Sequence, residues 1–306
     1  FRSINFTAEL EYKEVAPEAG DQAVRIVLGG LRGGHSGLEI NEGRANANKL
    51  MARVVVDAIA NFEARLASWK GGNMRNAIPR DAEVVLTLPA ENVAALKETV
   101  TEEWLKDFRD EYGYIEPNLT LEVVDTDMPE ALVPEEVQDN LANAILGCHN
   151  GVLRFIPHLP TIVETSSNLS IIEIADGKAF IKILVRSSSD SMRQYCVDTL
   201  EACFSMAGMK IETGGAYPAW QPSPKSEIVE IMREAYRDLF KEDPIVQVIH
   251  AGLECSVILS HCPNMDVVSF GPTLQSPHTP NERCHIPSVE GYWRLVLETL
   301  RRIPKK

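Results

Sequence analysis

The hydrophobic pattern of the first part of the chain alternates between two periods. Apolar residues recur at nearly every second position in segments 23–28, 81–88 and 119–124, and at every third or fourth position in segments 41–62 and 92–108. A period of two is typical of a half-buried strand, and a spacing of three and four is typical of an amphipathic helix. The pattern therefore predicts the order strand, helix, strand, helix, strand.

The same two periods return after the turn-rich residues 125–129. They predict helices over 134–148 and 191–206, strands over 169–174 and 179–185, and a short strand near 209–212. Asp176-Gly177 lies between two apolar runs and favours a hairpin turn, which joins antiparallel strands. We therefore expect residues 1–210 to form one α+β unit, with helices and an antiparallel sheet. No repeat at a fixed period is visible.

The composition changes abruptly at residues 214–224, which hold three prolines and two glycines and mark a crossing between domains. Beyond it the pattern predicts helices over 227–240, 253–259 and 288–303, and strands over 245–249 and 265–270. Alternating strands and helices favour a parallel sheet. About two strands cannot cover both faces of such a sheet, so we expect the second domain, residues 211–306, to need strands from elsewhere.

The net charge and the cysteine pattern indicate which kinds of partner and which cellular compartment are expected. The chain has 44 acidic and 30 basic side chains, a formal charge of −14, which disfavours nucleic acid as a partner. Its apolar runs are short and interrupted by charge, and its first residues do not have the layout of a secretory signal, so no membrane partner is predicted. The six cysteines are scattered without a CxxC pair, which favours a reducing cytoplasm over a disulfide framework or a zinc knuckle.

Two candidate sites lie in the second domain. His278 is flanked by Pro277 and Pro280, which restrict the backbone and could preorganise the imidazole as a zinc ligand, although a surface turn is an open alternative. His250 and Glu254 are four residues apart and could line one cleft as a base or a ligand. A helix N-terminus with a dipole-compensating glutamate explains that pair equally well.

The first domain offers a histidine on a glycine-rich turn. His35 lies in Gly33-Gly34-His35-Ser36-Gly37, where it could donate to a developing oxyanion or could simply be solvated. Asn76 and Arg186 are polar side chains near the ends of predicted elements. The guanidinium of Arg186 could bind a carboxylate through two hydrogen bonds, as a peptide C-terminus would require, or could lie in solvent.

Several long motifs carry a resemblance to a known family. They are GLRGGHSGLEINEGRANANKL (30–50), VETSSNLSII (163–172), VRSSSDSMR (185–193), IHAGLECSVI (249–258) and the region from 264 to 296 around SPHTPNERCHIP. They resemble the aminoacylhistidine (Xaa-His) dipeptidases, which belong to the dizinc metallopeptidases together with carnosinase and peptidase T. The resemblance extends from about residue 23 to residue 303.

The resemblance implies a cytoplasmic, homodimeric dipeptidase with two zinc ions per subunit in an α/β catalytic domain and a lid domain that makes the dimer. Residues 1–210 would be the lid and residues 211–306 the C-terminal βαβα portion of the catalytic domain. It further implies that His278 is a metal ligand and that Asn76 and Arg186 hold the substrate. His35 would polarise the scissile carbonyl, reaching the site of the partner subunit. His250 and Glu254 receive no individual role.

The sequence departs from the family in its metal motifs. The other zinc ligands and the general base of the family lie in His-x-Asp and Glu-Glu motifs before the lid, and the chain contains no His-x-Asp. We therefore expect a C-terminal fragment that does not bind both zinc ions and is catalytically incomplete. A dimerisation or binding module without catalysis is the rival hypothesis, and a thiol hydrolase using Cys255 or Cys284 is a more distant one.

Overall fold

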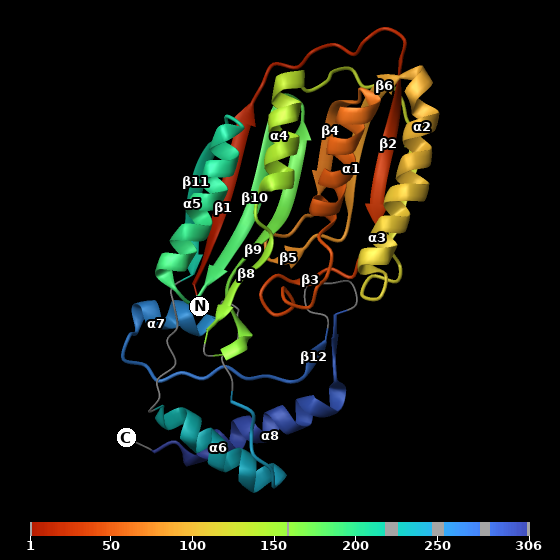
Figure 1. The fold of residues 1–306 in the computed structure, drawn as a ribbon. Coiled ribbons are helices and arrows are strands. Elements are labelled where there is room, and N and C mark those ends of the chain that lie inside the picture. Colours follow the sequence, from red (N-terminus) through yellow and green to blue (C-terminus); the bar gives the residue numbers. More distant parts are fainter. Residues whose placement is uncertain (1, 158, 218–225, 247–253, 276–281, 305–306) are drawn as a thin grey trace.

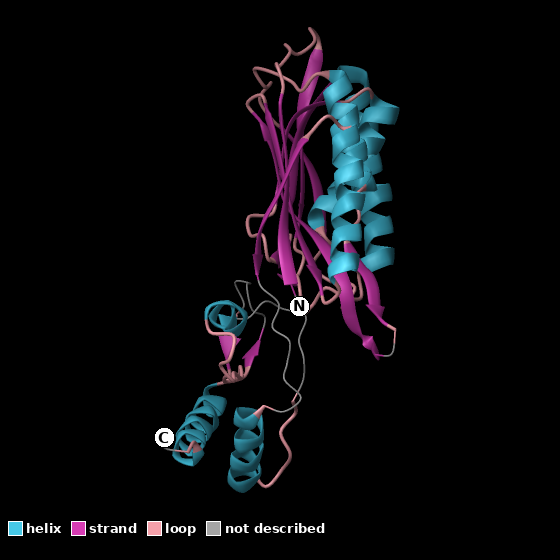
Figure 2. Cartoon of the chain, turned by 90° about the vertical axis from the view of Figure 1, so that its left-hand side faces the viewer, coloured by secondary structure: helices cyan, strands magenta, loops and turns pink. Residues whose placement is uncertain are grey.

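The computed structural model describes residues 2–157, 159–217, 226–246, 254–275 and 282–304 (Figure 1). Most of them belong to one large antiparallel sheet with helices on one face (Figures 1 and 2). Its strands, hydrogen-bonded in this order, are β11 (Lys210–Tyr217), β1 (Arg2–Glu11), β10 (Lys178–Ser187), β9 (Leu159–Ala175), β4 (Arg65–Gly71), β6 (Ala82–Pro89), β2 (Asp21–Gly29) and β7 (Thr120–Asp125), with β8 (Gly151–Ile156) paired to β9. The antiparallel α+β sheet predicted for the first domain is confirmed.

The covering helices follow the predicted apolar stripes. They are α1 (Ala47–Phe62), α2 (Val93–Glu98), α3 (Leu105–Tyr112), α4 (Glu135–Gly147) and α5 (Asp190–Met206); the short segments η1 (Ala90–Asn92) and η2 (Thr99–Trp104) make residues 90–112 one continuous helical stretch. The predicted start of α1 was six residues too early. The Asn46 side chain accepts hydrogen bonds from the backbone N–H groups of Asn48 and Lys49, so it caps the helix at that point.

The large sheet contains two units of the same topology, one inserted into the other. The inserted unit runs β2, α1, β4, β6, the helical stretch 90–112, β7, and its sheet order is β7-β2-β6-β4. The outer unit runs β1, α4, β9, β10, α5, β11, and its sheet order is β11-β1-β10-β9. In both units the strands are therefore arranged fourth, first, third, second, and the inserted unit lies between β1 and α4 of the outer unit.

A single hydrophobic core joins the two units beneath the helices. It includes Phe6 and Phe204 of the outer unit, whose ring centroids are 5.8 Å apart, and Trp69 and Leu86 of the inserted unit. All four side chains are fully buried. Burying a large apolar side chain stabilises a fold by about 1.5–3 kcal/mol, so a core shared in this way holds the units together.

The C-terminal part has a small core of its own. Its elements are α6 (Glu227–Phe240), α7 (Glu254–His261), β12 (Leu274–Gln275), β13 (Arg283–Cys284) and α8 (Ile286–Arg302). Helices α6 and α8 pack through Met232, Ala235 and Leu295. Helix α6 has the bounds that the sequence predicted, and α8 begins two residues earlier than expected.

The predicted parallel strands of this part are not found. Residues 265–270 form no strand, and neither do 245 and 246; residues 247–249 of the other predicted strand lie outside the described residues. The pair that does form, β12 with β13, is antiparallel. A strand has no internal hydrogen bonds, so an apolar run adopts this structure only beside a partner strand.

Candidate functional site

The glycine-rich segment that carries His35 forms a short strand at one end of the sheet. This strand, β3 (Gly34–His35), pairs antiparallel with β5 (Ala77–Ile78), which follows Asn76. Gly34 has a φ of +136°, and a Cβ on it would lie 2.2 Å from Nη1 of Arg44. A glycine is therefore required directly before the histidine.

The imidazole of His35 is held in one orientation by the backbone that follows it. Its Nδ1 accepts hydrogen bonds from the N–H groups of Gly37, at 3.1 Å, and of Leu38, at 3.0 Å. A nitrogen that accepts carries no proton, so the ring is the neutral tautomer with its hydrogen on Nε2. His35 is 8% exposed, which leaves this donor in a largely desolvated environment.

The loop around His35 is braced by a largely buried ion pair. Glu39 Oε2 accepts a hydrogen bond from the backbone N–H of His35 at 2.6 Å, and Glu39 Oε1 lies 2.6 Å from Nη2 of Arg44. The Arg44 guanidinium also donates to the carbonyl of Gly33. The side chains of Glu39 and Arg44 are 13% and 11% exposed, so this pair is shielded from solvent.

Ser36 contacts two of the three polar residues that the sequence singled out in the first domain and directly follows the third, His35. Its backbone N–H donates to the carbonyl of Asn76 at 2.9 Å, and its hydroxyl oxygen accepts a long hydrogen bond, 3.5 Å, from Nη2 of Arg186. Arg186 lies on β10, 150 residues further along the chain. The structure therefore brings His35, Asn76 and Arg186 together around Ser36 within one chain, whereas the resemblance implied that His35 reaches the site of the partner subunit.

Arg186 is the most unusual charge of this cluster. It is 5% exposed, its Nε is buried and makes no hydrogen bond, and among the described residues no ion pair joins it to a carboxylate. Burial, and next the positive charge of Arg75, lower the pKa of Arg186 to about 10. A buried guanidinium beside a second one favours the binding of an anion, because an anion compensates the desolvated charge.

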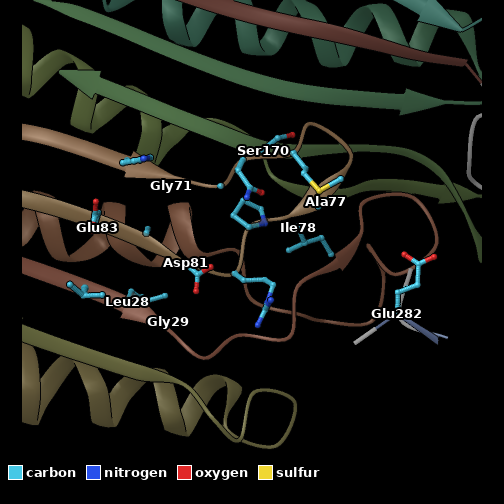
Figure 3. A pocket seen from close by; sticks show the side chains of 17 residues that line it. Leu28, Gly29, Gly71, Ala77, Ile78, Asp81, Glu83, Ser170 and Glu282 are labelled. Carbon is cyan, nitrogen blue, oxygen red and sulfur yellow. The ribbon is translucent and has the colours of Figure 1, made fainter. Parts of the chain in front are cut away.

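A pocket of about 680 Å³ opens beside β5, at the edge of the sheet where β2 and β4 end and β6 begins (Figure 3). Its lining includes Met74, Ala77 and Ile78 next to the cluster, Asp81 on the adjoining loop, and Glu282 of the C-terminal part. Pockets that bind small molecules are commonly of this size. The cluster thus adjoins an open pocket that is lined mainly by the sheet domain, with Glu282 contributed by the C-terminal part.

The residues predicted in the second domain are not tested by the structure. His250 and His278 lie outside the described residues, and so does the side chain of Glu254, although Glu254 is the first residue of α7. Within the described ranges, no three or more His, Cys, Asp or Glu side chains are grouped so that they could hold a metal ion. The described residues therefore do not fit a zinc site.

Sequence reasoning missed Arg75, Glu39 and Arg44. Arg75 directly precedes Asn76, and Glu39 follows His35 by four residues, so proximity to a candidate was the available signal. Charged residues in polar loops are usually solvated, and nothing in the pattern distinguished these. The thiols named as alternative nucleophiles, Cys255 and Cys284, are free and at least partly exposed.

Two of the known proteins most similar to this chain are dipeptidases. The cytosol non-specific dipeptidase of Escherichia coli (strain K12) is 38% identical over 303 residues, which are 99% of this chain and 62% of that protein. The crystal structure of aminoacylhistidine dipeptidase from Vibrio alginolyticus has 37% identity and a TM-score of 0.77, and the match covers 100% of this chain and 62% of that one. The chain thus spans about three fifths of the length of both relatives.

A comparison with protein families gives a match to one domain of the chain. Residues 26–115 match the peptidase dimerisation domain. This range begins within β2 and ends just after α3, so it covers the inserted unit without its last strand, β7. The resemblance to aminoacylhistidine dipeptidases is therefore confirmed by the whole-chain relatives and by this domain. In the described part of the chain, no helix is both long and apolar enough to cross a lipid bilayer.

Proposed function

We propose that this chain forms the lid domain and the C-terminal catalytic portion of a cytoplasmic, homodimeric metallo-dipeptidase that hydrolyses Xaa-His dipeptides. The convergence of His35, Asn76 and Arg186 around Ser36 carries this proposal. The sequence identity with two dipeptidases supports the reaction class. The division into residues 1–210 and 211–306 is part of the proposal, with the sheet continuing through β11 to Tyr217.

Each residue of the cluster has a role that its chemistry allows. The Arg186 guanidinium binds the carboxylate of the dipeptide, and Asn76 orients the substrate beside it. The Nε2–H of His35 donates to the carbonyl oxygen as negative charge develops there. A donor that is fixed beforehand and shielded from water stabilises that charge without having to reorganise.

The set of metal ligands is the incomplete part of the proposed site. The family resemblance implies two zinc ions per subunit, with His278 as one ligand, and no three or more His, Cys, Asp or Glu side chains of the described residues are grouped so that they could hold a metal ion. A zinc ion needs about four ligands, and the sequence has no His-x-Asp motif. We therefore propose that these 306 residues do not bind both zinc ions and do not hydrolyse dipeptides by themselves.

Calorimetry with two related ligands tests the substrate proposal. Glycyl-histidine should bind the chain at least about tenfold more tightly than its C-terminal amide, because the amide lacks the charge that Arg186 recognises. R186M should remove this difference, and R233M, which removes an exposed arginine of α6, should keep it. Equal affinity for acid and amide would contradict the proposed role of Arg186.

A zinc titration with a hydrolysis assay tests the proposed incompleteness. We expect no release of histidine from glycyl-histidine with added Zn²⁺. Tight stoichiometric binding of two zinc ions together with hydrolysis would contradict it.

The match to a dimerisation domain favours a second candidate function, a dimerisation module without catalysis. In that case the chain should be dimeric by light scattering and should bind neither glycyl-histidine nor its amide. Selective binding of the dipeptide would exclude this alternative.

A further inference from the structure

Asn5 and Arg186 lie on the face of the sheet that carries no helix. Phe6 of β1 and Val185 of β10 belong to the core beneath the helices, which cover one face only (Figure 2). Successive side chains of a strand point to opposite faces, so Asn5 and Arg186 point to the other one. Ser3, two residues before Asn5, is directly opposite Arg186 in the pairing of β1 with β10. Asn5 is thus a diagonal neighbour of Arg186, within reach of a long side chain.

Asn5 holds a second guanidinium group near Arg186. Nη1 of Arg75 donates to Oδ1 of Asn5 at 3.2 Å. The backbone of Arg75 is fixed as well, because its carbonyl accepts a 2.6 Å hydrogen bond from the hydroxyl of Ser170, which is fully buried in β9. The loop that presents Asn76 therefore also places Arg75 over the strand next to Arg186.

The two positive charges act on each other. Arg75 is partly buried and Arg186 is buried, so solvent screens their repulsion only weakly. After burial itself, the charge of Arg75 is the cause that lowers the pKa of Arg186. Two like charges held close together are unfavourable, and a ligand that carries two negative charges relieves this repulsion more fully than a ligand that carries one.

Neutral polar groups complete the surroundings of Arg186. Ser3 of β1 and Ser166 of β9 are its direct cross-strand neighbours, and both are buried. The hydroxyl of Ser36 accepts the hydrogen bond from Nη2 of Arg186. Hydroxyl groups can donate to carboxylate oxygens and bring no charge of their own. The lining of the site therefore suits an anionic ligand and leaves the two guanidinium groups to determine how much negative charge is preferred.

We propose that Arg75 and Arg186 form one subsite for two carboxylates, so that dipeptides with a C-terminal aspartate or glutamate are preferred ligands. This inference rests on the proposed function, in which Arg186 binds the C-terminal carboxylate. Arg75 binds the side-chain carboxylate of the same residue. A guanidinium has five N–H donors, so Arg75 can bind Asn5 and a carboxylate at the same time. Arg75 is then a specificity-determining residue, and Asn5 is a positioning residue that acts through it.

Calorimetry with glycyl-aspartate and glycyl-asparagine tests this inference, because the two ligands are of nearly equal size and differ by one negative charge. Glycyl-aspartate should bind the native chain at least about tenfold more tightly. R75M should reduce the difference to less than about twofold, and R75K, which keeps the charge, should retain most of it. N5A removes the acceptor that positions Arg75 and should reduce the difference in part.

The matched control is R25M. Arg25 of β2 lies beside Val24 and Ile26, which belong to the core, so it points to the same helix-free face as Arg186. Its side chain is 48% exposed and pairs with Glu83. R25M should keep the full preference for glycyl-aspartate. Equal affinity of the native chain for the two ligands, or a preference that R75M leaves intact, would overturn the inference.

Failure of this inference and failure of the proposed function are separate results. If glycyl-histidine binds better than its amide but glycyl-aspartate has no advantage over glycyl-asparagine, the role of Arg186 stands and that of Arg75 is refuted. If the advantage of glycyl-aspartate depends on Arg75 while glycyl-histidine and its amide bind equally, the subsite for two carboxylates stands and the proposed recognition of Xaa-His dipeptides is refuted.

Discussion

Glu39 accepts a 2.6 Å hydrogen bond from the backbone N–H of His35, and its other oxygen lies 2.6 Å from the guanidinium of Arg44. The backbone at His35 is therefore braced by an ion pair that does not touch the ring. Removal of one partner leaves the other charge largely shielded from solvent and without its counter-charge.

The variant R44M should lower the free energy of unfolding by about 1–3 kcal/mol, since a largely buried ion pair is broken from one side. It should also broaden or shift the ¹⁵N signals of the His35 ring, whose Nδ1 accepts hydrogen bonds from the backbone N–H groups of Gly37 and Leu38. The matched control is E42Q. Glu42 also contacts Arg44 but is 49% exposed, so its loss should change stability by less than about 0.5 kcal/mol. Equal effects of the two variants would rule out a special role for Glu39.

The core at the junction of the two units predicts a second result. Trp69 is fully buried in β4, and its Nε1 makes no hydrogen bond. W69A should cost about 3–5 kcal/mol through the cavity that it leaves. W69F removes less volume and breaks no hydrogen bond, so it should cost clearly less than W69A. Urea unfolding measures both, and similar losses would contradict the packing described.

Much of the secondary structure could be predicted because it follows local periodicity. Helices α1, α5 and α6 end at the predicted residue, since an amphipathic stripe is a property of neighbouring positions. Strand β4 was missed, because Arg65-Leu66-Ala67-Ser68-Trp69 lacks a clear alternation. The pairing of β4 with β9 joins residues about 100 positions apart, and no local signal specifies such a pairing.

For the candidate site too, some features could be predicted from the sequence and others could not. Glycines around His35 and the fork of Arg186 suggested chemistry, and the family resemblance assigned their roles. The contact through Ser36 depends on the strand register and could not be read from the sequence. The roles of His250, Glu254 and His278 remain predictions.

Lys49 gives a third prediction, at the C-terminal end of α4. Its ammonium group donates to three carbonyls there, those of Ile145, Leu146 and Cys148, and compensates the negative end of the helix dipole. K49M should destabilise the protein by about 1–3 kcal/mol because these partly buried acceptors lose their donor. K97M breaks the exposed pair with Asp125 and should cost about 0–1 kcal/mol. Hydrogen exchange at the end of α4 should rise in K49M and stay unchanged in K97M.

The buried thiols predict how stability depends on alkaline pH. Burial raises the pKa of Cys148 to about 12 and that of Cys196 to about 11. An unfolded thiol has a pKa of about 8.5, so above that pH the unfolded state loses protons that the folded state keeps. The free energy of unfolding should therefore fall as pH rises from about 9 to 11, by up to about 1.4 kcal/mol per pH unit for each thiol.

Chemical denaturation at pH 8, 9, 10 and 11 measures this dependence. C196A should reduce the slope, and C262A, which removes an exposed thiol, should leave it unchanged. A slope that is the same in all three proteins would contradict the burial of Cys196 as the cause.

The most direct test of the dipeptide site is a crystal structure of the chain with glycyl-histidine. The account predicts that the dipeptide carboxylate lies against the guanidinium of Arg186, with Asn76 and the Nε2 of His35 from the same chain within hydrogen-bond distance of the ligand. A dipeptide bound away from Arg186, or one that contacts His35 of a second chain, would contradict it.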